Sequence, residues 1–144
     1  YRPTKDWNFE FDIDWTDWDN LNQIVFRGIG APPLVLNYRS SLMYEFGITR
    51  RLGKGYFVST GYIFSENSSP DQNFTPIVPD ADLHLGSIGF GHKGRRWDWA
   101  LGYHFAYNPG REVQRSPVPF LGNSADGVYR TLNHAINLST TLKF

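Results

Sequence analysis

Apolar and polar residues alternate without interruption near the start of the chain, in the segment WNFEFDIDW, residues 7–15. Its odd-numbered residues are all large and apolar, whereas the residues between them are polar and mostly acidic. Successive side chains of a β-strand point to opposite faces, so this pattern predicts a strand with one apolar and one charged face. A soluble sheet buries the apolar face, whereas a membrane barrel turns it towards lipid around a polar lumen. The period alone leaves both arrangements open.

The rest of the chain predicts further strands and no helix. Glycine and proline interrupt the sequence at short intervals, and the segments between them favour a period of two. We predict seven strands, over residues 4–16, 21–29, 37–50, 56–65, 83–92, 97–107 and 129–144. Short connections, such as TDWDN, RLGKG and KGRR, alternate with longer loops over residues 28–36, 66–82 and 108–127.

Three features favour a membrane barrel over the alternative, a soluble sandwich or lipocalin-like barrel. Outer-membrane barrels have short turns at the periplasmic end and longer loops outside. Strands of about 12 residues at ~3.3 Å each, tilted by ~45°, match a hydrocarbon thickness of ~30 Å. Aromatic residues near the strand ends indicate two girdles. We expect Trp15, Trp97 and Trp99 near the short turns, and Tyr62, Phe64, Phe105 and Tyr107 near the long loops.

The composition excludes several function classes. The formal net charge is zero, so nothing indicates a nucleic-acid partner. There is no cysteine for a disulfide or a thiolate metal site, and the scattered histidines, His84, His92, His104 and His134, predict no zinc site. His84 and Ser87 are three positions apart, on opposite faces of a strand, which argues against a catalytic dyad. We therefore predict neither enzymatic activity nor a cofactor.

Two internal segments and the end of the chain resemble a known family. The segments FTPIVPDADLHLGSIGFG, residues 74–91, and WNFEFDIDWTDW, residues 7–18, are similar to the FadL-type outer-membrane transporters of long-chain fatty acids and aromatic hydrocarbons. The last segment, HAINLSTTLKF, ends in Phe144 and looks like the terminal strand of outer-membrane barrels, whose final aromatic is part of the assembly signal. Family members usually follow Pro-Asp-Ala-Asp with Arg, where this chain has Leu83.

The resemblance implies passive transport of hydrophobic molecules across the outer membrane of a Gram-negative bacterium. It implies an all-β fold, an antiparallel multi-pass transmembrane β-barrel of 14 strands plugged by a small N-terminal hatch. Residues 1–144 would form a single segment, the C-terminal half of this barrel, without the hatch and the N-terminal strands. The alternative is an outer-membrane barrel of another class, such as an adhesin, a structural porin-like barrel or a lipid-modifying enzyme.

The same interpretation implies the partners. They are a hydrophobic small-molecule ligand, outer-membrane lipid, the barrel-assembly machinery and the missing N-terminal half of the barrel, which would close two open sheet edges. Fatty acids, alkanes and monoaromatics would use similar apolar linings, so the residues do not distinguish between these substrates.

Strand parity predicts which side chains line the lumen. Five glycines share the inward parity and make room for the hatch or an acyl chain, or simply relieve crowding between strands. They are Gly47, Gly61, Gly89, Gly91 and Gly102. Phe57 and Ile63 also have inward parity and would add an apolar lining for a ligand.

Charged residues of inward parity predict a salt-bridge ladder in the lumen. Its members would be the acids Glu10, Asp12 and Asp14 and the bases Arg27 and Arg39, because an unpaired charge in a restricted cavity is costly. The functional alternative is recognition of a carboxylate by Arg39 or Arg27, whose guanidinium fork suits that group.

The loop motif contains Pro79, Asp80 and Asp82. Aspartates in such turns commonly accept hydrogen bonds from local backbone N–H groups. We expect this capping role for Asp80 and Asp82 rather than a metal site.

Overall fold

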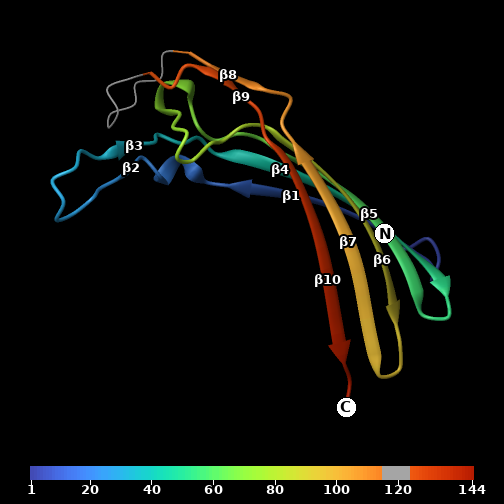
Figure 1. Cartoon of the computed structure of the whole chain (residues 1–144). Helices are drawn as coiled ribbons and strands as arrows, with labels where there is room; N and C mark the ends of the chain where they lie inside the picture. Colours follow the sequence, from blue (N-terminus) through green and yellow to red (C-terminus); the bar gives the residue numbers. More distant parts are fainter. Residues whose placement is uncertain (115–123) are drawn as a thin grey trace.

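The main feature of the molecule is one curved antiparallel sheet (Figure 1), seen in a computed structural model that describes residues 1–114 and 124–144. The sheet order is β1–β4–β5–β6–β7–β10. The bounds are β1 (Trp7–Thr16), β4 (Ser41–Gly53), β5 (Tyr56–Ser65), β6 (Leu83–Lys93), β7 (Trp97–Tyr107) and β10 (Leu132–Leu142). The predicted antiparallel all-β class is therefore confirmed. Among the described residues, no helix has the length and apolar character needed to cross a membrane.

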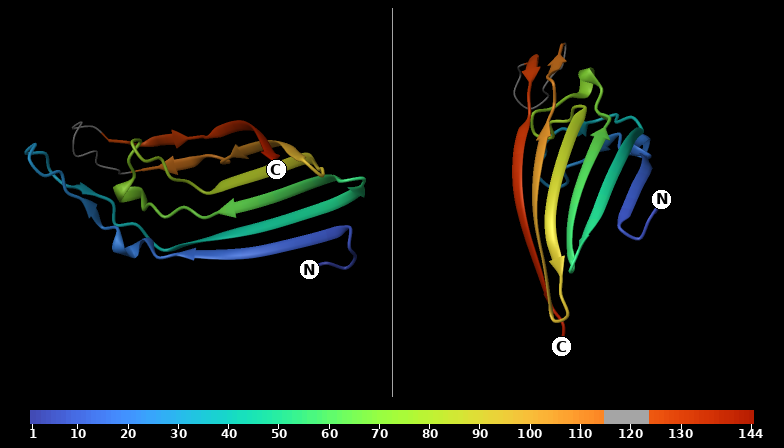
Figure 2. Two further views of the ribbon diagram at one scale, coloured as in Figure 1. Left: turned by 90° about the horizontal axis from the view of Figure 1, so that it is seen from below. Right: turned by 90° about the vertical axis from the view of Figure 1, so that its right-hand side faces the viewer.

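The connections separate onto two ends of the sheet (Figure 2). The long connections β1–β4, β5–β6 and β7–β10 lie at one end, which we call the loop end; the tight turns and both termini lie at the other, the turn end. The long loops contain two 3-10 helices, η1 (Trp18–Asn20) and η2 (Asp71–Asn73), and two small hairpins. These hairpins pair β2 (Gln23–Ile24) with β3 (Leu34–Val35) and β8 (Arg111–Val113) with β9 (Gly127–Tyr129). The loop predicted over residues 108–127 includes residues 115–123, which lie outside the described part.

The strand predicted over residues 21–29 is wrong. Only Gln23–Ile24 is extended, and it pairs with Leu34–Val35 inside the first long loop. Gly28 and Gly30 take φ angles of +85° and +65°, and the prolines that follow lack backbone donors, so no sheet strand can continue there. TDWDN therefore belongs to a long loop. Trp15 consequently lies at the loop end, not near the short turns as predicted.

Two other strands have different bounds from those predicted. β4 begins at Ser41 rather than at residue 37, because Asn37 has a φ of +44° and interrupts the extended backbone. The segment predicted as one strand over residues 129–144 divides into the end of β9 and all of β10.

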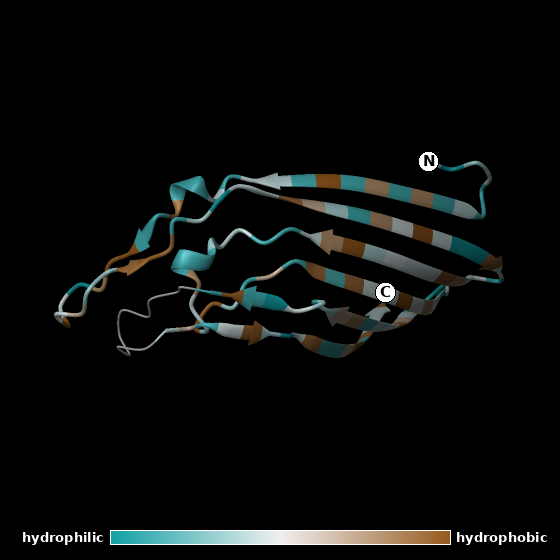
Figure 3. Ribbon diagram, turned by 90° about the horizontal axis from the view of Figure 1, so that it is seen from above, coloured by the Kyte–Doolittle hydropathy of each residue, from teal (hydrophilic) through white to brown (hydrophobic). Residues whose placement is uncertain are grey.

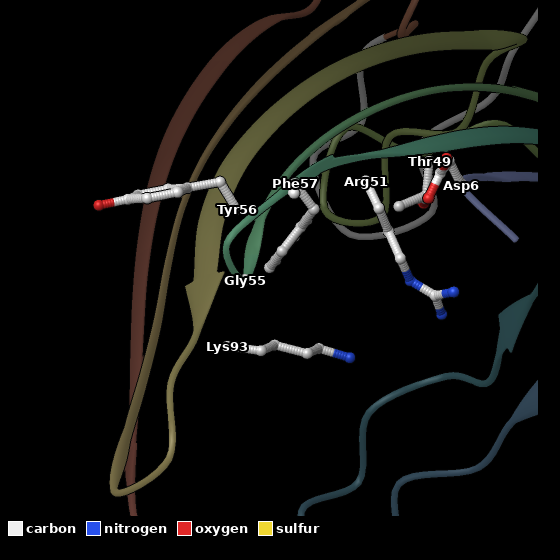
Figure 4. A pocket seen from close by; sticks show the side chains of 8 residues that line it. Asp6, Thr49, Arg51, Gly55, Tyr56, Phe57 and Lys93 are labelled. Carbon is white, nitrogen blue, oxygen red and sulfur yellow. The ribbon is translucent and has the colours of Figure 1, made fainter.

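The strand register gives the sheet one apolar and one polar face, and the stripes are visible in Figure 3. Phe11 lies opposite Phe46 across β1 and β4, in line with the apolar residues of the other strands. Figure 4 shows Phe57 and Lys93 pointing into the hollow of the curved sheet, whereas Tyr56 points away from it. We call the polar, concave side the inner face and the apolar side the outer face.

The outer face is exposed instead of being packed in a core. Phe11, Ile88 and Leu138 are 54%, 63% and 70% exposed. Among the described residues, the fully buried large side chains lie instead in the loop region and the short strand β8; they are Leu36, Phe74 and Val113. A soluble sandwich would bury one face of its sheet against another layer. A contiguous apolar surface of this extent marks contact with lipid, so the sheet is the wall of a membrane barrel.

Candidate functional site

Three cavities follow one another along the inner face, from the loop end to the turn end. The first, of about 360 Å³, lies at the loop end and includes Pro79, Asp80 and Phe74 in its lining. The second, of about 250 Å³, lies over the middle of β5, β6, β7 and β10. The third, of about 410 Å³, lies at the turn end (Figure 4). Phe57 lines both the second and the third cavity, so these two adjoin.

The middle cavity is open because Gly102 lies in its floor. Gly89 and Gly102 face each other across β6 and β7, and both line the cavity. A Cβ atom added at Gly102 would meet only Nε2 of His104, at 3.7 Å, and a backbone oxygen at 3.9 Å. This is ordinary van der Waals contact, so Gly102 leaves free space at the centre of the inner face.

Three of the other predicted glycines make room for neighbouring side chains. A Cβ atom at Gly91 would lie 2.5 Å from the ring of Phe57, its cross-strand partner. Ser87 and Ser59 cover their partners Gly61 and Gly89 in the same way, with hydroxyl oxygens at 2.9 and 2.6 Å, whereas at Gly47 the nearest atom belongs to Glu10 and lies at 3.4 Å, an ordinary contact. The contacts at Gly61, Gly89 and Gly91 favour relief of crowding between strands. Ile63 lies on the inner face, opposite Glu45 and Leu85, and lines none of the three cavities.

The turn-end cavity combines an aromatic wall with cations. Lys93 Nζ lies 5.9 Å from the centre of the Phe57 ring, and Arg51 lines the same space. Arg51 Nη1 donates a hydrogen bond of 2.7 Å to the backbone oxygen of Lys5. Arg2 and Lys5 line an adjoining cavity of about 190 Å³, together with Arg51 and Lys93. Asp6 is the acidic residue in these linings, so positive charge dominates the turn end.

Sequence reasoning missed this basic group. Arg51 is near the end of β4, Lys93 is the last residue of β6, and Arg2 and Lys5 come from the segment before β1, so only the fold brings them together. Strand parity could have indicated it. Arg51 is two residues after Thr49 and Lys93 two residues after Gly91, so both share the parity of the inner face.

Neither arginine predicted for the lumen lies on a strand of the sheet. Arg27 is in the β2–β3 hairpin loop and Arg39 precedes β4. Both side chains are exposed, and the backbone N–H of Arg39 donates to the Ser68 carbonyl at 2.8 Å. For Arg27 the error follows from the absence of a sheet strand over residues 21–29, and for Arg39 from the start of β4 at Ser41 rather than at residue 37.

The predicted salt-bridge ladder is also wrong. Within residues 1–114 and 124–144, the salt bridges join Arg111 to Asp71 and Lys143 to Asp98, each at 2.8 Å. Asp12 lies opposite another acid, Glu45, across β1 and β4. The loop-end half of β1 and β4 therefore has an acidic inner face, opposite in sign to the turn end.

The loop aspartates accept backbone hydrogen bonds, as their position in the motif predicts. Asp80 Oδ2 accepts from the N–H groups of Ser68 and Ser69, at 2.6 and 2.8 Å. Asp82 Oδ1 accepts from the backbone N–H of Asn67 at 2.8 Å. The described part of the chain holds no group of three or more His, Asp or Glu side chains that could bind a metal ion.

Arg111, in β8, forms hydrogen bonds with the β5–β6 loop, which contains these aspartates. Its Nη1 donates to the Asp80 carbonyl at 2.6 Å, its Nη2 donates to Asp71 Oδ1 at 2.8 Å, and its Cζ lies 5.0 Å from the centre of the Phe74 ring. Nearby, burial raises the pKa of Tyr38, and the negative charge of Asp80 raises it further, so this hydroxyl stays neutral. Residues of two loops thus form a fixed rim beside the first cavity.

The histidine–serine pair and the C-terminal phenylalanine are the remaining candidates. His84 is on the outer face, whereas Ser87 is on the inner face above Gly61, so the two cannot act as a dyad. Phe144 lies two residues beyond the end of β10 and is fully exposed.

A curved antiparallel sheet with an exposed apolar outer face, aromatic residues at both ends and a cavity-lined inner face defines a transmembrane β-barrel protein. The model of the family described as outer membrane protein transport protein (OMPP1/FadL/TodX) matches residues 1–117, and the chain belongs to this family. It is a family of outer-membrane transporters of hydrophobic compounds, which confirms the resemblance seen in the sequence. No curated protein matches the chain.

Proposed function

We propose that this chain forms one wall of a passive uptake route for hydrophobic molecules, with long-chain fatty acids as the preferred class and aromatic hydrocarbons as the next. The observation that carries this proposal is the line of cavities along the inner face, which ends beside Arg51 and Lys93. An apolar molecule with a carboxylate matches a path that begins between loops and finishes among cations.

The path has three stages. The ligand enters the loop-end cavity beside Pro79 and Asp80 and passes over the open floor at Gly102. Its carboxylate then meets Arg51 and Lys93, while its chain contacts the ring of Phe57. The sequence has no nucleotide-binding loop, so we propose that movement follows the concentration gradient.

The sheet needs further strands to work in this way. β1 and β10 are its two edge strands, and unpaired backbone groups are not tolerated in the hydrocarbon region. We propose that further strands of the same barrel pair with β1 and β10, enclose the inner face, and make the protein multi-pass in the outer membrane of a Gram-negative bacterium. Recognition of Phe144 by the assembly machinery belongs to the same proposal.

The test compares two substrates in a strain lacking the endogenous transporter. The double variant Arg51→Gln/Lys93→Gln should reduce oleate affinity by roughly 100-fold or more, because it removes two hydrogen bonds to the carboxylate and hydrogen bonds to charged groups contribute about 1.5–3 kcal/mol each. Toluene uptake should be unchanged, since toluene has no carboxylate. The matched control is Arg39→Ala, an exposed loop arginine that should affect neither substrate.

The outcomes separate the hypotheses. Unchanged oleate affinity in the double variant contradicts the carboxylate site at the turn end. Loss of oleate affinity in Arg39→Ala with an intact barrel would instead assign recognition to the loop arginine. A structural barrel or adhesin is the second candidate, because side chains cover Gly61, Gly89 and Gly91; wild-type protein that restores uptake of neither substrate would favour it.

A further inference from the structure

Two histidines lie on the lipid-facing side of the sheet near the loop end. His84 is the second residue of β6 and His134 the third of β10, and both share the parity of the apolar outer face. At ~3.3 Å per residue they lie within about 10 Å of the strand ends, at the depth of lipid headgroups. A polar ring in this position is costly unless it has a partner.

Each histidine is held by a tyrosine in the same way. His84 Nδ1 lies 2.7 Å from the hydroxyl of Tyr62, and His134 Nδ1 lies 2.6 Å from the hydroxyl of Tyr103. When the tyrosine donates to Nδ1, the imidazole hydrogen is on Nε2, which then becomes a donor. Within residues 1–114 and 124–144, Nε2 of His84 and of His134 has no hydrogen-bond partner. The arrangement therefore fixes two rings and leaves one donor on each.

The third histidine of the outer face behaves differently. His92 lies at the turn end, where its Nε2 is 3.1 Å from the backbone oxygen of Lys54 and its ring lies 4.6 Å from that of Tyr56. The donor of His92 is thus used within the protein. Among the outer-face histidines of the described residues, the free donors lie at the loop end, on both sides of Phe105 and Tyr107 in β7, among exposed aromatic rings.

A gap in the aromatic band lies directly below His84. Gly86 is on the outer face between Tyr62 and Phe105, which are its partners on β5 and β7. A Cβ atom added at Gly86 would meet nothing within 4 Å. An acyl chain can therefore lie between the two rings, directly below the donor on His84.

We infer that this surface, formed by His84, His134, Tyr62, Tyr103 and Gly86, binds the phosphate headgroup of a lipid in the membrane leaflet at the loop end. Phosphate oxygens are strong acceptors and complement the two Nε2 donors, while the Gly86 gap takes an acyl chain. The inference depends on the outer face meeting lipid and not on which molecule is transported. Its failure would leave uptake through the inner face untouched.

The experiment measures lipid binding by native mass spectrometry of the complete protein released from lipid discs. The probes are lipid A and a diacylglycerol, which lacks phosphate. The double variant His84→Phe/His134→Phe keeps aromatic area but removes both donors, and we expect it to bind lipid A about 10-fold more weakly and diacylglycerol unchanged. The control His92→Phe should bind lipid A as the wild type does.

Two results would overturn the inference. One is wild-type affinity of the double variant for lipid A; the other is an equal loss in His92→Phe, which would indicate a nonspecific effect of removing imidazoles. If the double variant does not fold, as judged by heat-modifiable gel mobility, the variant Gly86→Leu tests the inference instead. It retains both donors and fills the gap, so it should weaken lipid A binding several-fold, and unchanged binding would contradict the inference.

Discussion

At the scale of single residues, two glycines of the inner face have opposite roles. Gly91 lies beneath the ring of Phe57 and beside the carbonyl of Trp99, so a Cβ atom there would meet one at 2.5 Å and the other at 2.7 Å. Gly102 has only ordinary contacts around its missing side chain. Glycine is therefore required by packing at Gly91, whereas at Gly102 it keeps the middle cavity open.

This difference gives a first prediction. Gly91→Ala should destabilise the folded protein by about 1–3 kcal/mol, because the backbone carbonyl of Trp99 cannot move as a flexible side chain would. Gly102→Ala, the matched control, should leave stability unchanged within about 1 kcal/mol, because alanine reduces the entropy of the unfolded chain. Urea unfolding followed by heat-modifiable gel mobility measures both. Equal midpoints for the two variants would contradict the packing role of Gly91.

The same cavity gives a prediction on transport. Gly102→Leu should fold, yet it should reduce uptake of oleate and toluene alike, since the added side chain enters the middle of the proposed path. Gly102→Ala should transport at nearly the wild-type rate. Comparable initial uptake rates for the leucine variant and the wild type would show that ligands do not pass over β6 and β7.

At the scale of elements, the β5–β6 loop is fixed from two directions. Asp80 and Asp82 accept backbone hydrogen bonds within the loop, and Arg111 donates to it from β8. Phe74 packs with Val113, Ala125 and Tyr129 in a small core that joins this loop to the following one. The loop end is therefore ordered by residues of two loops acting together.

The predicted consequence concerns Arg111→Lys. Lysine keeps the charge but cannot reproduce the forked donation to Asp80 and Asp71, nor the planar contact with Phe74. The loop should lose about 1.5–3 kcal/mol of stabilisation from these hydrogen bonds, which should accelerate hydrogen exchange at the Ser68 and Ser69 amides by 10-fold or more. Amides in the middle of β5 provide the internal reference. Exchange at the wild-type rate would show that the aspartates hold the loop without Arg111.

The elements also show how far the sequence could be interpreted alone. Alternation identified the six strands of the sheet, because in each of them one face meets lipid and the other does not. It failed over residues 21–29, where Ile24, Val25 and Phe26 are consecutive apolar residues but only Gln23–Ile24 forms a short strand, outside the main sheet. Arg111 could not be found in this way, since its partner Asp80 is 31 residues away and only loop packing brings them together.

At the scale of the whole molecule, the parity of each strand predicted the two faces, yet parity could not place the cavities. Their positions depend on which glycines remain uncovered, as at Gly102, and on which cations the curvature of the sheet brings to one end, as with Arg51 and Lys93. Both depend on contacts between strands and turns that are distant in sequence. The functional argument therefore depends on the assignment of the outer face to lipid and the inner face to the lumen.

Site-directed spin labelling tests that assignment most directly. The chain has no cysteine, so single cysteines at Phe11, Ile88 and Leu138 on the outer face, or Ser59 and Asn137 on the inner face, each report one position. In native membranes, labels on the outer face should collide more often with oxygen, which dissolves in lipid, and labels on the inner face more often with a water-soluble nickel complex. Outer-face labels that respond to nickel, or that are shielded from both reagents as in a packed protein core, would contradict the account.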